Sequence, residues 1–292
     1  MDIRNIKTEA PEIRDGKYLE AIYDLEAELL KGYCGKIEKD LPLPPIDINS
    51  FKGQQILKDF SARIIEETAE GYESTSAILE IFSTKGYNKD LIDKEEWQMI
   101  LNHLQNSNEE QADALAFYMA LLQYANLQIS DVYDYANHIL KKYFGRDLSY
   151  PIENLTDLFR FGDFLVSEYV DERVRSYNLL EESDIEVMGL DVNHVLSYLP
   201  AFRQSSQQVH KSEDHMLWEV AYHICISRNY LKNKPWKQTQ ELTDITRYSA
   251  NVIMGLIKYL GYLNKMGFTP ESLYILCFKK NQVNQFRQRS NY

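Results

Sequence analysis

Apolar residues recur at intervals of three and four along most of this chain, which is the spacing of one face of an α-helix. The clearest run lies between residues 60 and 82, and its apolar members are Ile64, Ile65, Ala69, Tyr72, Ala77, Ile78 and Ile81. We therefore predict one long helix over 60–82.

Two further helices are predicted in the first part of the chain. Ser107 and Asn108 are residues that commonly cap a helix start, and a helix following them would turn an apolar face towards a core: Ala112, Leu115, Ala116, Met119 and Leu122. Ser130 is predicted to cap a third helix over 131–142.

The helical spacing of apolar residues resumes at about Met216. We predict a helix over 218–231, ended by the Asn-Lys-Pro run at 233–235, and another opened by Thr243 and Asp244 and reaching about residue 266. Gly267 ends that helix. The Thr-Pro-Glu run at 269–271 starts the last one, because proline suits a first helical turn.

The segments 113–146 and 254–287 share a helix–turn–helix layout at a shift of 141 residues. This predicts an all-α fold of two diverged repeats forming a fused pseudo-dimer. The first half spans 1–150, a connecting segment 151–211, and the second half 212–292. The polar run RQSSQQ at 203–208 is the expected linker.

Composition narrows the classes of function. The 292 residues include 44 acidic and 32 basic ones, for a net charge of −12, and such a surface repels nucleic acid. Three cysteines without CxxC spacing indicate a reducing compartment. The N-terminus has no signal-peptide pattern, and the apolar stretch 251–263 is interrupted by Lys258. We expect a cytoplasmic protein with neither a nucleic-acid nor a membrane partner.

Candidate chemistry lies in two acidic helical segments, IIEETAEGYES and NEEQADALAFY. Residues three apart share one helix face, so each segment presents a pair of carboxylates, Glu67 with Glu70 and Glu110 with Asp113. If the two helices face each other, these carboxylates repel one another unless a divalent cation lies between them. Oxygen ligands of this charge suit Mg²⁺.

Solvated helix faces are also rich in glutamate, so an ordinary surface is the alternative interpretation of these pairs. Such a surface usually interleaves lysine or arginine. Here the neighbours are small residues instead: Ala69, Gly71, Ala112 and Ala114.

EETAE at 66–70 followed by EQADALAF at 110–117 resembles the EExxE…ExxD signature of all-α nucleoside-triphosphate (NTP) pyrophosphatases, which include MazG-like proteins and dimeric dUTPases. KNQVNQFRQ at 280–288 with the final tyrosine resembles the closing segment of dimeric dUTPases and related phage dCTP/dUTP pyrophosphatases. NKPWK at 233–237 is similar, more weakly, to their substrate loop.

The resemblance implies an all-α fold of the NTP pyrophosphatase type and a hydrolase that converts a pyrimidine dNTP, dUTP first and dCTP next, to dNMP and pyrophosphate. The implied cofactor is Mg²⁺, with Mn²⁺ as a substitute, and its ligands are Glu67, Glu70, Glu110 and Asp113. Glu67 is also assigned the catalytic role of orienting the attacking water. The implied substrate-binding residues are Lys280, Asn284, Arg287, Tyr292 and Trp236. The chain is expected as a monomeric pseudo-dimer or a homodimer.

The second half departs from this pattern. Asn251 and Met254 stand at the positions aligned with Glu110 and Asp113, and EVAYHICISRN has no ExxE. A single surviving site is therefore expected. The gap between Glu70 and Glu110 is longer than in compact MazG-like proteins, and the intervening segment 83–106 is expected to be a loop.

Other interpretations remain open at this stage. The polar residues of the last helix can form an ordinary solvated face, and Trp236 can fill the core. The six histidines show no HxH or HxxxH pair, which argues against zinc. The alternative function is a catalytically inactive helical interaction protein that keeps the fold.

Overall fold

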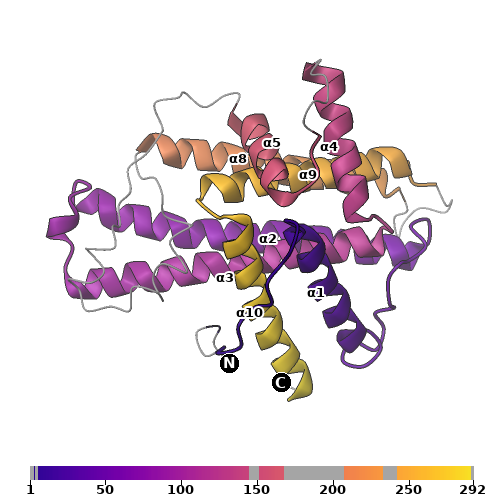
Figure 1. Ribbon diagram of the computed structural model, residues 1–292, viewed down its shortest axis with the longest axis horizontal. Coiled ribbons are helices and arrows are strands. Elements are labelled where there is room, and N and C mark those ends of the chain that lie inside the picture. Colours follow the sequence, from indigo (N-terminus) through magenta and orange to yellow (C-terminus); the bar gives the residue numbers. More distant parts are fainter. Residues whose placement is uncertain (1–2, 4–5, 145–150, 168–206, 233–241, 291–292) are drawn as a thin grey trace.

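The computed structural model describes residue 3 and residues 6–144, 151–167, 207–232 and 242–290. This part of the chain is all-α, with eight α-helices and one 3-10 turn but no strand. In Figure 1, α2 (Phe51–Thr84) and α3 (Lys94–Tyr124) form one long hairpin, and α8 (Gln207–Tyr230) and α9 (Ile245–Lys265) lie above it as a second pair.

The α2–α3 hairpin begins and turns at defined capping residues. The Ser50 side chain accepts a hydrogen bond from the Gly53 N–H, and α2 therefore starts nine residues before the predicted 60. Asp93 and Glu96 form a capping box at the start of α3. Such reciprocal bonds satisfy N–H groups that a helix start leaves unpaired.

Two predictions about the first part of the chain were wrong. Ser107 and Asn108 do not cap a helix, because α3 runs through them and both are buried. Most of the predicted loop 83–106 is helical, since Trp97, Ile100 and Leu104 continue the apolar face of α3. The hairpin is therefore much longer than the acidic motifs alone indicated.

The other predicted helices are present, and the starts of α4 and α8 are shifted. α4 (Ile129–Phe144) begins one residue before Ser130, and the Asp131 side chain accepts from the Gln128 N–H. α8 starts well before the predicted 218. α9 starts after Asp244 as predicted.

The predicted connecting segment 151–211 contains α5 (Leu155–Ser167), which packs on α9. Gly162 of α5 and Gly261 of α9 lie backbone to backbone, and a Cβ atom on either would collide with the other helix. Of the predicted linker 203–208, the first four residues lie outside the described residues and the last two belong to α8.

α1 (Tyr18–Tyr33) and α10 (Pro270–Arg289) lie side by side and cross the hairpin (Figure 1), and both contact α3. α10 begins with Thr269 as its N-cap and Pro270 in its first turn, as predicted. The Asn281 side chain donates to the Leu25 carbonyl oxygen at 2.9 Å, which fixes α10 against α1. The last helix of the chain is thus held over the middle of α3.

Among the described helices, none is both long and apolar enough to cross a membrane.

Candidate functional site

The close approach of α2 and α3 is set by a small residue and a buried amide. Gly71 of α2 faces the Gln111 side chain of α3, and a Cβ atom at Gly71 would collide with the Gln111 amide nitrogen. Gln111 is fully buried. The Tyr259 hydroxyl of α9 lies 2.7 Å from the side-chain oxygen of Gln111 and 2.8 Å from its carbonyl oxygen. These contacts hold α2, α3 and α9 together beside Glu110.

Three of the predicted metal ligands meet at this point. One carboxylate oxygen from each of Glu67, Glu70 and Glu110 lies within 4.8 Å of the other two. Glu67 and Glu110 are half-buried, whereas Glu70 is exposed. Three of the four predicted ligands thus lie together, and Asp113, the fourth, lies outside this group.

The negative charges in this cluster disturb one another. Burial raises the pKa of Glu67 to about 8, together with the hydrogen bond to Glu110 and the charges of Asp113, Glu110 and Glu70. Burial also raises the pKa of Glu110, although the hydrogen bond to Glu67 and the charge of Lys280 oppose it. Glu67 therefore holds a proton near neutral pH and donates it to Glu110.

Asp113 follows one helical turn after Glu110 and is ion-paired with Lys280 of α10. The Lys280 Nζ lies 2.8 Å from an Asp113 oxygen and 3.5 Å from a Glu109 oxygen. Burial raises the pKa of Asp113, and the charge of Lys280 opposes that rise. Burial by itself would lower the pKa of Lys280, but Asp113, Glu109 and Glu110 outweigh it and raise that pKa. Lys280 thus links α10 to the acidic cluster.

The other predicted substrate-binding residues are placed differently. Asn284 is half-buried one turn after Lys280 and lines a pocket beside it. Arg287 is exposed, and its charge lowers the pKa of Asp113. Trp236 and Tyr292 lie outside the described residues.

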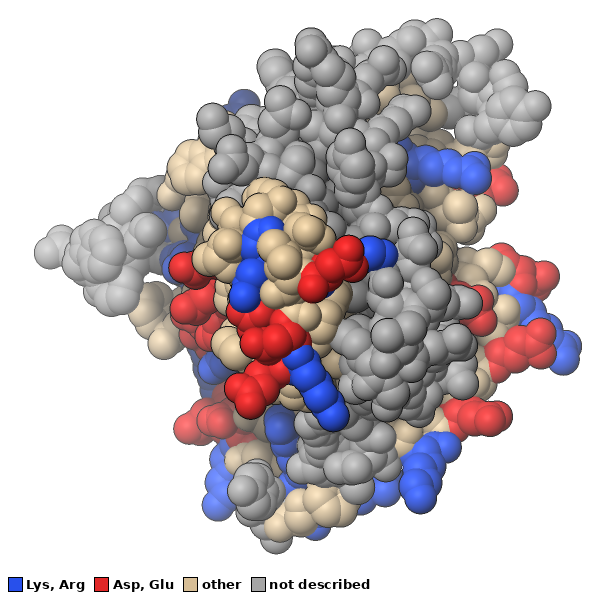
Figure 2. All heavy atoms as spheres, turned by 90° about the vertical axis from the view of Figure 1, so that its left-hand side faces the viewer, with Lys and Arg blue, Asp and Glu red and all other residues tan. Residues whose placement is uncertain are grey.

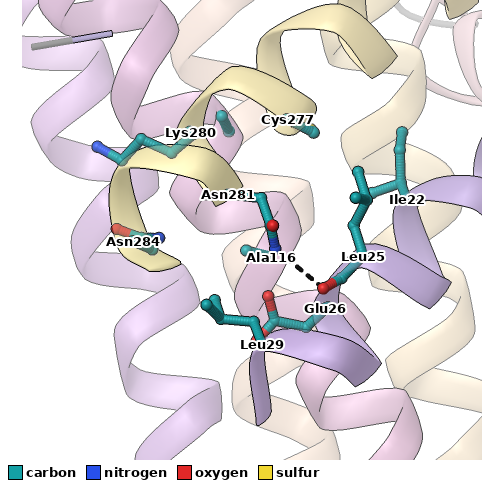
Figure 3. Close-up of a pocket in the computed structure, with 10 residues that line it drawn as sticks. Ile22, Leu25, Glu26, Leu29, Ala116, Cys277, Lys280, Asn281 and Asn284 are labelled. Atoms are coloured by element: carbon teal, nitrogen blue, oxygen red, sulfur yellow. Dashed lines mark hydrogen bonds between the residues drawn. The ribbon is translucent and has the colours of Figure 1, made fainter. Parts of the chain in front are cut away.

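The pocket beside Lys280 contains a residue that the sequence analysis missed. It lies between α1, α3 and α10, and Glu26 of α1 points into it (Figure 3). Glu26 is 8% exposed, and burial together with the charge of Asp113 raises its pKa well above the usual value. The available signal was its position four residues after Ile22 and four before Leu30, on the buried face of α1.

Exposed charges elsewhere on the hairpin are arranged differently from this cluster. Figure 2 looks at the molecule from the side where α2 and α3 are joined, and acidic and basic side chains are interspersed there. At this end of the hairpin, Lys85 lies 2.8 Å from Glu96. Among the described residues, no ion pair joins Glu67, Glu70 or Glu110 to a basic residue of α2 or α3, although Arg63 precedes Glu67 by one turn and pairs with Asp59.

The second helix pair carries no comparable group of carboxylates in its described part. Glu219 of α8 is ion-paired with Lys258 of α9. The His223 ring lies 3.2 Å from the Asn251 side-chain oxygen. The position aligned with Glu110 thus holds an amide that contacts a histidine.

Searches against protein-family models, curated proteins and solved structures gave no match for this chain.

Proposed function

We propose that this protein is a Mg²⁺-dependent pyrophosphatase that hydrolyses a pyrimidine deoxynucleoside triphosphate to the monophosphate and pyrophosphate. The observation that carries the proposal is the close group formed by Glu67, Glu70 and Glu110, with Lys280 and Arg287 beside it. Carboxylates suit a hard cation, and the cationic side chains suit phosphate oxygens.

The chemistry of the donor set fits Mg²⁺. All three side chains offer oxygen ligands. Burial and the neighbouring negative charges raise the pKa of Glu67 to about 8, and a bound cation would offset those charges. Glu67, Glu70 and Glu110 would hold the ion. Asp113 would join them once Lys280 transfers its hydrogen bond from Asp113 to a phosphate oxygen. Mg²⁺ commonly keeps several water ligands and binds few carboxylates.

In the proposed reaction a water oxygen bonds to the α-phosphorus and the bond to the oxygen bridging the α- and β-phosphates breaks. When bound, Mg²⁺ supplies charge neutralisation on the phosphate oxygens. Glu67 in its ionised form accepts the proton of the water. Lys280 and Arg287 hold the phosphate chain, so pyrophosphate leaves as a bound anion.

We also propose that the two helix pairs are diverged copies in a fused pseudo-dimer with one working site. The α2–α3 hairpin would supply the metal ligands, and α10 of the second half would supply Lys280, Asn284 and Arg287. The pairing of Glu219 with Lys258 supports this division, since that helix pair already holds its own cation.

The test is pyrophosphate release from the four canonical dNTPs and dUTP, each with Mg²⁺, with Mn²⁺ and with excess chelator. We expect Mg²⁺-dependent release of one pyrophosphate per pyrimidine dNTP, with Mn²⁺ partly replacing Mg²⁺ and chelator abolishing the reaction. Nuclear magnetic resonance of ³¹P distinguishes pyrophosphate from stepwise release of phosphate. Absence of hydrolysis with every nucleotide would contradict the proposal and favour an inactive helical interaction protein.

A further inference from the structure

Two tyrosines, Tyr118 of α3 and Tyr259 of α9, stack against each other where the hairpin meets the second helix pair. Their ring centroids are 5.3 Å apart, at an interplanar angle of 28°, and both side chains are fully buried. They stand 141 residues apart in the sequence, which is the shift that relates the two proposed repeats. A two-fold axis brings equivalent residues into contact where it passes between two copies. The stack therefore lies where such an axis would pass.

The helix ends that follow the two tyrosines support this equivalence. α3 and α9 end 141 positions apart. Two residues beyond each end the backbone has a positive φ, which is 57° at Asn126 and 91° at Gly267. The next N–H group donates to the carbonyl oxygen five residues earlier in both turns, over 2.8 Å from Leu127 and 3.0 Å from Phe268. The two tyrosines thus occupy equivalent places in two similar helix–turn segments.

The hydroxyl groups of the two tyrosines have different surroundings. The Tyr259 hydroxyl lies 2.7 Å from the Gln111 side-chain oxygen and 2.8 Å from the Gln111 carbonyl oxygen, and it donates from α9 to α3. Val252 stands at the position equivalent to Gln111 and offers no side-chain acceptor. The Tyr118 hydroxyl is buried and has no hydrogen-bond partner among the described residues. Of this pair of tyrosines, Tyr259 is therefore the one that connects the helix pairs through its hydroxyl.

Gln111 relates this hydrogen bond to the acidic cluster through its place on α3. It directly follows Glu110, and its amide nitrogen packs against Gly71, which directly follows Glu70 on α2. Within the described part of the chain, that nitrogen has no hydrogen-bond partner. The hydrogen bond from Tyr259 is therefore the contact that orients the amide at the point where the two carboxylate-bearing helices touch.

Resting on the proposed function, we infer that Tyr259 is a positioning residue for the proposed metal site on α2 and α3. Its hydroxyl fixes the Gln111 amide, and the amide fixes the separation of the two helices. That separation sets how closely Glu67, Glu70 and Glu110 converge on one ion. Burial raises the pKa of Tyr259 well above its usual value, so the hydroxyl stays protonated and donates at neutral pH. The second helix pair thereby determines the Mg²⁺ affinity of the first.

The experiment compares Tyr259→Phe with Tyr118→Phe, because each removes one hydroxyl group from the same buried stack. Mg²⁺ binding to the full chain is measured by calorimetry, and Mn²⁺ binding by the paramagnetic resonance signal of the free ion. Tyr259→Phe should weaken binding of both ions about tenfold, which corresponds to the loss of one hydrogen bond. Tyr118→Phe should stay within about twofold of the parent affinity and keep or exceed the parent Tm, because it removes a buried hydroxyl without a described partner.

Two further variants separate positioning from loss of stability. Leu263→Ala removes a buried side chain one turn after Tyr259 on α9. It should lower the Tm at least as much as Tyr259→Phe, yet keep Mg²⁺ affinity within about twofold. In a Gln111→Leu background, Tyr259→Phe should lower Mg²⁺ affinity by less than about threefold, since the side-chain acceptor is already absent. A full tenfold loss in that background would mean that Tyr259 acts by another route.

The outcomes distinguish this inference from the proposed function. If the parent protein binds Mg²⁺ and releases pyrophosphate, but Tyr259→Phe binds Mg²⁺ equally well, Tyr259 has no positioning role and the proposed function stands. If Tyr118→Phe or Leu263→Ala weakens Mg²⁺ binding as much as Tyr259→Phe, general loosening of the core explains the loss and the inference is wrong. If the parent protein binds neither ion and hydrolyses no dNTP, the proposed function fails, and the inference fails with it.

Discussion

The α2–α3 hairpin and the α8–α9 pair differ in how their acidic side chains are neutralised. On the hairpin, Glu67, Glu70 and Glu110 lie close together, and none of them forms an ion pair with a described residue of either helix. On the second pair, Glu219 of α8 meets Lys258 of the neighbouring helix α9. One pair of helices includes its own cation, and the other brings three carboxylates together without a cation from either of its helices.

This difference has a physical consequence for each pair. A lysine on the neighbouring helix neutralises the acidic side chain permanently and excludes a metal ion from that position. Without a lysine, the carboxylates of the hairpin reduce their repulsion by sharing a proton, as the raised pKa of Glu67 indicates. A divalent cation can displace that proton, whereas a built-in ammonium group cannot be displaced so readily.

The largest expected effect follows from removing a carboxylate from the hairpin. Glu70→Ala or Asp113→Ala should lower the rate of pyrophosphate release by about a thousandfold, because several kcal/mol of charge stabilisation depend on the bound ion. The measurement is the steady-state rate with Mg²⁺, with circular dichroism to show unchanged helix content.

Two controls compare the hairpin with the second pair. Glu73→Ala changes an exposed glutamate of α2 less than one turn after Glu70, and Glu219→Gln changes the paired acid of α8. Both should keep the parent rate within about threefold, since neither side chain belongs to the group formed by Glu67, Glu70 and Glu110. If Glu70→Ala and Asp113→Ala also hydrolyse dNTPs at the parent rate, the assigned metal site is wrong.

A smaller effect concerns pH. The folded pKa of Glu67 is about 8, against 4.5 for an unperturbed glutamate, so Mg²⁺ must displace a proton below pH 8. Mg²⁺ affinity should rise by up to about tenfold per pH unit towards pH 8 and then level off. Glu67→Gln should bind Mg²⁺ more weakly, with a much smaller slope. A steep slope retained in Glu67→Gln would show that another group holds the displaced proton.

The same shift has the opposite sign for stability without metal. A raised folded pKa contributes stability that is fully present below about pH 4.5 and is lost as the pH rises through about 8. The Tm of the Mg²⁺-free protein should therefore fall across this window more than that of Glu67→Gln. Scanning calorimetry in the presence of chelator measures the difference.

The sequence predicted the helices that carry the acidic pairs, because both the helices and the pairs depend on local spacing. Residues three apart share a helix face wherever the helix goes, so Glu67 and Glu110 could be placed in the candidate site. The start of α3 was missed because Ser107 and Asn108 have strong capping preferences, and their burial against α2 overrides those preferences. The Thr75 hydroxyl lies 3.1 Å from that of Ser107 across the hairpin.

Glu26 could not be assigned from local spacing. Its surroundings depend on α10 crossing α1, and the hydrogen-bonded residues Leu25 and Asn281 are 256 positions apart along the chain. A glutamate on an apolar helix face indicates a buried acidic group. Only the packed structure shows that this group lines a pocket beside Lys280. The same holds for Tyr259, whose hydroxyl reaches Gln111 from the other helix pair.

The smallest expected effect compares one glycine from each pair. Gly71→Ala should lower Mg²⁺ affinity by about tenfold and the Tm by a few degrees, because overpacking a tight contact costs about 1–3 kcal/mol. The added methyl group would push Gln111, which is fully buried and hydrogen-bonded to Tyr259, and so cannot move aside freely. Glu110 moves with that part of α3 and away from Glu67.

Gly255→Ala in α9 is the matched change in the second pair. Its Cβ atom would lie 3.3 Å from the nearest side-chain atoms of Ile224 and Tyr118, a much smaller encroachment than the 2.3 Å approach at Gly71. Replacing a helical glycine by alanine also gains up to about 1 kcal/mol in helix propensity. Mg²⁺ affinity should therefore stay within about twofold of the parent value. Equal losses of Mg²⁺ affinity in the two variants would mean that general loosening of the fold, rather than the spacing of α2 and α3, controls the carboxylate cluster.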